Sequence, residues 1–238
     1  MTMATVGLVG GLGPESTIDY YRRILDAWQR DDPSTAPSIV IDSLDVLRAL
    51  DLVARDRGAH RVPACLPVPP CARRRRLVAM TANTPHIVFD ALAAQSPVPL
   101  VSIVEVCAEG ARRRDLRRVA LLGTRFTMEA PFCPEVCARF GVAVVTPREA
   151  DRRWIHERHI GELLRGEFRD DTRAEFVALV RRLRDEDRAE RIILGGTELP
   201  LLLPTPAIAD LPALDTTALH VAAIVERLRQ AQAADVAG

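Results

Sequence analysis

The chain has 238 residues, and its 32 basic and 32 acidic side chains balance to zero net charge at pH 7. Every basic residue is an arginine, so no lysine amine is present for a Schiff base, a pyridoxal-phosphate aldimine or a phosphate-binding loop. The neutral balance argues against nucleic-acid binding, which normally needs a basic face. Hydrophobic residues make up 48% of the chain but form no run of the about 18 residues that a membrane span needs, so we expect a globular protein that does not enter the membrane.

The first residues lack the basic start of a signal peptide and lead directly into a strand-like run. The cysteines are odd in number and show no zinc-binding spacing: Cys65, Cys71, Cys107, Cys133 and Cys137. We therefore expect reduced thiols, no metal site and a cytoplasmic location.

Short apolar runs alternate with helical patterns along the chain. Strands are predicted at 6–9, 38–41, 77–80, 100–104, 118–122, 142–145 and 191–194. Helices are predicted where apolar residues recur with helical spacing, at 15–28, 87–94, 151–164, 171–183 and 216–231. Short buried strands that alternate with helices indicate an α/β fold with mainly parallel sheets flanked by helices.

Two features occur twice at nearly the same spacing, which indicates an internal repeat. A strand that ends in Gly10 is matched by one that ends in Gly123, and a strand that leads into Asn83 is matched by one that leads into Thr197. Ligands of such sheets bind beyond the carboxyl ends of the strands, so we expect the repeated loops to line a cleft between two pseudo-symmetric domains. The predicted domains are 1–105 with 210–238, and 106–209.

Residues 55–76 do not fit this pattern, because the segment combines four prolines and two cysteines with a run of arginines. Two interpretations stay open. The segment is either a solvated native loop or a stretch translated from a shifted reading frame, since GC-rich DNA read out of frame yields Pro, Arg, Ala and Cys. If no single-base shift in the gene restores a helical pattern in this segment, the second interpretation is wrong.

Polar residues at the predicted strand ends are the candidates for function. Asn83, the only asparagine in the chain, and Thr84 offer an amide, a hydroxyl and backbone N–H groups to an anion. Thr124 and the Thr197-Glu198 pair can do the same in the other half. Each of these residue types also serves as an ordinary helix cap or turn residue. Their recurrence at matching positions nevertheless favours a site for a small anion.

Several motifs occur in the order found in a known family: VGLVGGLGPESTIDYY at 6–21, TANTPH at 81–86, LLGTRFTM at 121–128, ELLRGEF at 162–168 and ILGGTELP at 193–200. With them, the chain resembles the PLP-independent aspartate/glutamate racemases, and their aspartate racemase branch in particular, over a unit of 4–230. The resemblance implies an active site between two α/β domains, a homodimer, no cofactor, and a small amino or dicarboxylic acid as ligand. The substrate-binding residues that it implies are Gly11, Asn83, Thr84, Thr124, Thr127 and Thr197.

The reaction of that family uses two thiol groups on opposite faces of the acidic α-carbon. The cysteines stand immediately before the Asn-Thr pair and the Thr-Glu pair, and this chain has Ala82 and Gly196 there. One positioned acid or base contributes roughly 10²–10⁴-fold to a rate, so loss of both should remove nearly all two-base racemisation.

Three functions therefore stay open. The chain is a cofactor-independent amino-acid racemase or isomerase by resemblance, a non-catalytic carboxylate-binding or regulatory homologue, or a lyase or isomerase that uses a base other than cysteine. His86, beside the Asn-Thr pair, and Glu198 are the substitute bases considered. His86 has an alternative role as a helix cap, and Glu198 as a support of its loop.

Overall fold

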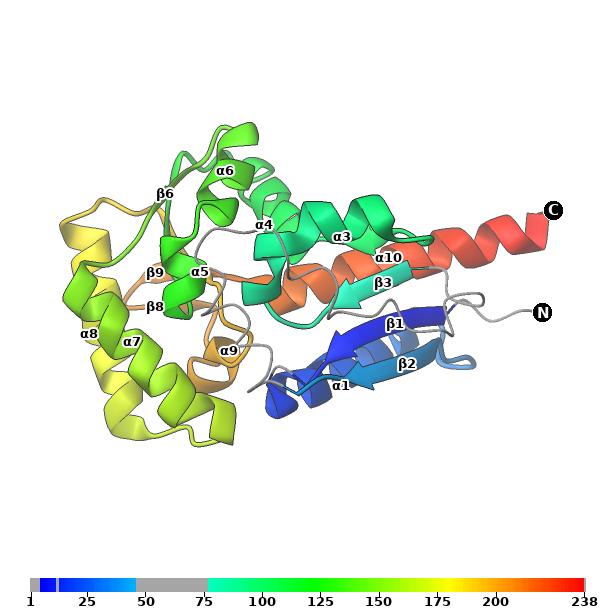
Figure 1. Ribbon diagram of the computed structural model, residues 1–238, viewed down its shortest axis with the longest axis horizontal. Coiled ribbons are helices and arrows are strands. Elements are labelled where there is room, and N and C mark those ends of the chain that lie inside the picture. Colours follow the sequence, from blue (N-terminus) through cyan, green and yellow to red (C-terminus); the bar gives the residue numbers. More distant parts are fainter. Residues whose placement is uncertain (1–4, 12, 46–76, 238) are drawn as a thin grey trace. The chain divides into compact units, whose positions relative to one another are not determined.

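The computed structural model describes residues 5–11, 13–45 and 77–237, which fall into two compact units (Figure 1). The first unit comprises Met1–Ser102 and His220–Gly238, and the second comprises Ile103–Leu219. The sequence-based division differs at 103–105 and at 210–219, which both lie in the second unit, because Ile103 begins a helix of that unit and Leu211–Asp215 forms a strand of its sheet. The segment 55–76 lies outside the described residues.

Four parallel strands form the sheet of the first unit, in the order β2-β1-β3-β4. Their bounds are β1 Thr5–Gly10, β2 Ser38–Ser43, β3 Leu77–Met80 and β4 Leu100–Val101. The predicted strand at 100–104 ends early because Ile103 begins a helix. β1 and β3 are buried along their whole length, as expected of central strands in a parallel sheet.

Helices cover the first sheet: α1 Pro14–Gln29, the short 3₁₀ helix η3 Thr84–Val88, α3 Phe89–Gln95 and the final α10 Thr216–Ala237, of which the part from His220 belongs to this unit. α1 starts with a proline at its first turn and buries Tyr20, Ile24 and Trp28, one residue per turn of the same face. Val9, Val78 and Met80 form a core cluster with Leu92 of α3.

A buried histidine connects three elements of the first unit. The Nε2 atom of His220 lies 3.0 Å from the carbonyl oxygen of Val101, and its Nδ1 lies 2.9 Å from the hydroxyl of Tyr20. Because a carbonyl can only accept, Nε2 donates to Val101 and Nδ1 accepts from Tyr20. Burial lowers the pKa of His220 to about 3, so the ring is neutral and α10 is fixed against β4 and α1.

The sheet of the second unit has the order β6-β5-β7-β9-β8, parallel except for β8. Its strands are β5 Arg118–Leu122, β6 Ala143–Val145, β7 Arg191–Leu194, β8 Ala207–Ile208 and β9 Leu211–Asp215. In each unit the second parallel strand lies at the edge, followed by the first, third and fourth. The predicted α/β fold with two mainly parallel sheets flanked by helices is confirmed, and the shared strand order agrees with the internal repeat.

The second unit has the helices α4 Ile103–Arg112, α5 Arg125–Glu129, α6 Phe132–Arg139, α7 Glu149–Gly161, the 3₁₀ turn η4 Leu163–Arg165, α8 Asp170–Asp185 and α9 Leu199–Leu202. α8 packs Phe176, Leu179, Val180 and Leu183 into the core. α7 buries Ile155 and His159, one turn apart, and Leu163 is buried one turn further on.

The pairing of β8 with β9 is a hairpin that the sequence pattern did not predict. Ala207 pairs with Pro212 and Ile208 with Leu211, which leaves a two-residue turn of Ala209 and Asp210. Both turn residues have positive φ, 49° and 63°, as a type I′ turn requires. Asn-Gly is the usual sequence signal for this turn, and Ala-Asp does not carry it.

Among the described residues, no helix has both the length and the apolar character to cross a bilayer.

Candidate functional site

The candidate residues follow strands at a specific place in each sheet. In the first unit, β1 and β3 are neighbours in the sheet. The chain runs from β1 to β2 at one edge of the sheet and then returns to β3 on the other side of β1. β5 and β7 have the same relation in the second unit. The carboxyl ends of such strand pairs are where ligands bind in open α/β sheets. Gly11 and Asn83 follow β1 and β3, and Thr124 and Thr197 follow β5 and β7.

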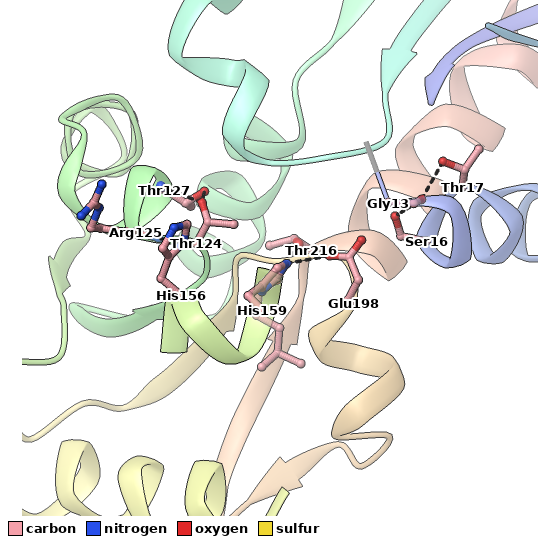
Figure 2. Close-up of polar contacts among 11 residues, drawn as sticks. Gly13, Ser16, Thr17, Thr124, Arg125, Thr127, His156, His159, Glu198 and Thr216 are labelled. Atoms are coloured by element: carbon pink, nitrogen blue, oxygen red, sulfur yellow. Dashed lines mark hydrogen bonds and ion pairs between the residues drawn. The ribbon is translucent and has the colours of Figure 1, made fainter. Parts of the chain in front are cut away.

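The loop after β1 is shaped by Gly11 and held by Thr17. Gly11 has a φ of 80°, and a Cβ there would lie 2.4 Å from the Leu44 carbonyl oxygen, so only glycine fits. The backbone N–H of Gly11 donates to Thr17 Oγ1 over 3.0 Å, and that hydroxyl donates to the Gly13 carbonyl, also over 3.0 Å (Figure 2). The Thr81 hydroxyl, directly after β3, lies 3.4 Å from the Thr17 hydroxyl. Hydrogen bonds within the protein thus set the backbone of this loop.

Ala82, Asn83 and Thr84 continue from β3 into η3. Asn83 is buried at the start of η3, whereas Ala82 and Thr84 are half-buried. His86 Nδ1 donates to the Ala82 carbonyl over 3.0 Å, and its ring stacks on Phe89. Burial lowers the pKa of His86 to about 4, which keeps the imidazole neutral. The ring thus donates to a backbone carbonyl and packs on Phe89, while no described side chain caps the start of η3.

In the second unit, Thr124 is the N-cap of α5. Its Oγ1 accepts from the Thr127 backbone N–H over 3.3 Å and lies 3.2 Å from the Thr127 hydroxyl (Figure 2). The preceding Gly123 is required by close packing, because a Cβ there would lie 2.7 Å from the Gly195 carbonyl oxygen. The predicted ligand residues Thr124 and Thr127 are therefore side by side, and the glycines after β5 and β7 let the two loops approach each other.

Position 196 faces the imidazole of His159. A Cβ placed on Gly196 would lie 2.4 Å from Cε1, 3.2 Å from Nδ1 and 3.4 Å from Nε2 of that ring. Real Cβ atoms essentially never come within 3.0 Å of a neighbouring atom, so no side chain larger than glycine fits unless the ring moves. The imidazole occupies the space into which a residue at 196 would extend.

His159 forms a buried pair with Glu198. Its Nε2 lies 2.9 Å from Glu198 Oε2, and the two side chains are only 2% and 4% exposed. Figure 2 shows the ring of α7 directed at the carboxylate after β7. An ionised carboxylate can only accept, so Nε2 donates in this pair. Nδ1 has no hydrogen-bond partner among the residues that the structure describes.

A second histidine of α7 supports α5. His156 Nδ1 accepts from the Arg125 backbone N–H over 3.4 Å, and its ring contacts Phe126 edge to face. Partial burial, with Arg125 nearby, lowers the pKa of His156. The neutral ring thus acts as a hydrogen-bond acceptor for the start of α5.

The cysteines that can be placed lie away from the strand ends. Cys107 is buried in α4, and Cys133 and Cys137 are buried in α6. Burial raises the pKa of Cys107, and a hydrogen bond with Cys137 together with burial raises that of Cys133. Both remain thiols at neutral pH. Cys65 and Cys71 lie outside the described residues, among which no group of His, Cys, Asp and Glu side chains is arranged to hold a metal ion.

His159 is the residue that sequence reasoning missed. A signal for it exists, because it lies between Ile155 and Leu163 at helical spacing, and these neighbours are fully buried. A histidine in the middle of an apolar stripe needs a polar partner inside the protein. The sequence alone does not tell which distant residue supplies that partner.

Comparison with known proteins agrees with this architecture. A family model described as Asp/Glu/Hydantoin racemase matches residues 9–224. A candidate Asp/Glu racemase from Yersinia pestis is 28% identical, with a TM-score of 0.80 over 95% of this chain and 99% of that one. An aspartate racemase homologue from Pyrococcus horikoshii is also 28% identical, with a TM-score of 0.74 over 95% and 100%.

A third structure shares the fold at lower identity. It is the glutamate racemase from Francisella tularensis, solved in complex with D-glutamate, which is 12% identical with a TM-score of 0.66 over 98% of this chain and 83% of that one. Because the family model spans nearly the whole chain and the fold matches along the full length of the Yersinia and Pyrococcus proteins, the resemblance read from the motifs is confirmed. The chain belongs to the Asp/Glu/hydantoin racemase family.

Proposed function

We propose that this protein binds a small amino or dicarboxylic acid without a cofactor, at the loops that follow β1, β3, β5 and β7. The observation that carries the proposal is the contrast at these strand ends. The polar residues Asn83, Thr84, Thr124, Thr127 and Thr197 are all present, while the positions before two of the loops hold Ala82 and Gly196. Random loss of function would be expected to damage the polar residues as well.

The same contrast argues against two-thiol racemisation by this chain. Methyl and hydrogen side chains can neither take nor return a proton, and the placed cysteines are buried in α4 and α6. The chain also has no lysine to form an aldimine. The proposed activity is therefore recognition of the carboxylate, with the chemistry left to another group.

Isothermal titration with L- and D-aspartate, L- and D-glutamate and succinate tests the proposal. We expect at least one of these probes to bind, and the Thr124→Val variant to bind it about 10-fold or more weakly, since a hydrogen bond to a charged group is worth about 1.5–3 kcal/mol. Addition of pyridoxal phosphate or EDTA should not change the affinity. Failure of all five probes to bind would refute the proposed ligand class.

Thr35→Val is the matched control. Thr35 lies before β2, at the sheet edge opposite the candidate loops, where its hydroxyl donates to Asp32 and accepts from Trp28. Loss of this hydroxyl should leave the affinity unchanged. Equal weakening by both variants would show that Thr124 acts through general stability rather than through the ligand.

The proposal also includes a homodimer in the cytoplasm, as in the family resemblance. Light scattering coupled to size exclusion measures the mass, for which we expect twice the 26.2 kDa of one chain. A mass of one chain at micromolar concentration would contradict the dimer.

A further inference from the structure

The ring of His159 is placed where the chain lacks a side chain. Its Cε1 lies 2.4 Å from the Cβ position of Gly196, and Nδ1, on the same edge of the ring, lies 3.2 Å from it. Gly196 precedes Thr197 in the loop that we propose binds the carboxylate. The space that a residue at 196 would fill is thus occupied by an imidazole ring.

The hydrogen bonding of the ring leaves one nitrogen available as a base. Nε2 donates to the Glu198 carboxylate at 2.9 Å, and the tautomer that makes this hydrogen bond has its lone pair on Nδ1. That atom is buried and has no partner among the described residues. A buried polar atom without a partner costs about 1–3 kcal/mol, and such an exception calls for a function. A carboxylate that fixes the tautomer of a histidine base is a recurrent catalytic arrangement.

We propose that His159 is the single catalytic base of this protein and that Glu198 is its positioning residue. The inference rests on the proposed function, because the substrate is the amino acid bound at the same loops. Nδ1 takes the α-proton, the C–H electron pair passes into the substrate carboxylate as an enolate, and the ring becomes an imidazolium stabilised by Glu198. The same Nδ1 then returns a proton to the carbon.

The stereochemical outcome follows from the use of a single base. Inversion needs a second proton donor on the opposite face of the α-carbon, and the proposed mechanism has none. Proton removal and return through one base give exchange with retention of configuration. In deuterated water, the ring exchanges its proton with solvent and delivers a deuteron to the original face. The expected activity is therefore α-deuteration without racemisation.

Access to Nδ1 requires movement, because the atom is covered in the structure. The ring must turn, or the loop 195–198 must shift, for a substrate carbon to reach it.

The test is proton exchange with L-aspartate and L-glutamate in deuterated water, followed by NMR for deuterium at the α-carbon and by chiral chromatography for configuration. We expect α-deuteration with retention. His159→Gln should lower the exchange rate by about 10²–10⁴-fold, the contribution of one positioned base, while the Kd from titration changes less than about threefold. Glu198→Gln should lower kcat by at least about tenfold at nearly constant KM, since an amide no longer fixes the tautomer.

Arg153→Gln is the matched control, since it changes an exposed residue of the same helix, whose side chain pairs with Glu149 at the surface, and it should leave the exchange rate within about threefold. A two-bond ¹⁵N–¹H spectrum gives a readout besides activity. The His159 signals should show a proton on Nε2 in the native protein and a shift of that proton toward Nδ1 in Glu198→Gln.

The outcomes separate the two proposals. Binding without deuteration, or deuteration that survives His159→Gln, overturns the catalytic role of His159 and leaves the proposed ligand class standing. Deuteration with inversion overturns the single-base mechanism. Failure of every probe to bind overturns both proposals.

Discussion

At position 196 a glycine faces an imidazole ring, and this contact leaves no room for a larger side chain. The Cβ of any larger residue would lie 2.4 Å from the His159 ring. The ring itself is held by Glu198, so it cannot move aside without losing a buried hydrogen bond. The identities of residues 159 and 196 are therefore coupled, although 36 residues of chain lie between them in the printed sequence.

Gly196→Ala should lower the free energy of unfolding by about 1–3 kcal/mol, the usual cost of overpacking a filled interior. In a His159→Ala background the ring is gone, and the same substitution should cost much less. Urea unfolding of the four proteins in this double-mutant cycle measures the coupling free energy, which we expect to exceed about 1 kcal/mol. Additive effects would contradict the contact.

The effect of introducing a thiol pair should depend on the same contact. Ala82→Cys with Gly196→Cys places two thiols in a protein whose ring still fills the second position. Addition of His159→Ala frees the space, so we expect racemisation of aspartate or glutamate in the triple variant, at least about 100-fold faster than in the double variant. Chiral chromatography measures the rate. Equal rates in both variants would show that the ring does not block position 196.

At the scale of elements, the β8–β9 hairpin has a turn sequence that is unfavourable for its backbone conformation. Ala209 and Asp210 both adopt positive φ, which costs roughly 1–2 kcal/mol for a residue with a Cβ. Arg184 compensates in part, since its Nη1 donates to the Ala209 carbonyl over 2.6 Å. The ion pair of Arg184 with Asp210 is long, at 3.4 Å, and its carboxylate is exposed, so it contributes little.

Replacement of this turn by Ala209→Asn with Asp210→Gly should raise the free energy of unfolding by about 1 kcal/mol, because these residues prefer the type I′ conformation. The urea midpoint measures the change, with an unchanged m-value as the control for two-state unfolding. A lower midpoint would mean that the Arg184–Asp210 pair outweighs the turn preference.

The sequence predicts features that depend on neighbouring residues better than features that depend on contacts between distant segments. Strands β3, β5 and β7 were predicted at their observed bounds, since each is a short apolar run closed by a polar or glycine residue. The hairpin was missed because its turn lacks glycine and asparagine. In the candidate site, local motifs point to Asn83, Thr124 and Thr197, which follow β3, β5 and β7 and stay predictions. The His159 contact was not predictable, because it joins two segments that only the folded sheet brings together.

At the scale of the whole molecule, two buried neutral histidines make the protein sensitive to acid. The ordinary histidine pKa is 6.5, and burial lowers that of His86 to about 4 and that of His220 to about 3. The unfolded chain therefore binds more protons than the folded one below pH 6.5. Burial of the two neutral rings therefore stabilises the protein fully above pH 6.5. This stabilisation is lost as the pH falls toward the histidine pKa values of the folded state.

The free energy of unfolding should accordingly fall between pH 6.5 and pH 4.5, a window above the range in which most carboxylates titrate. Each histidine contributes a slope of up to about 1.4 kcal/mol per pH unit. Urea titrations at several pH values give the slope, and His86→Gln should reduce it by about half. A slope that does not change in this variant would exclude His86 as a source.

The position of His220 also sets the order in which the two units can be completed during synthesis. The second unit, Ile103–Leu219, is one continuous stretch of chain, whereas the first needs residues from both ends. Tyr20 and Val101 leave the ribosome early but must wait for His220, which is made after the whole second unit. Domains generally fold as units while translation proceeds. The unit whose synthesis starts first is therefore the one that finishes folding last.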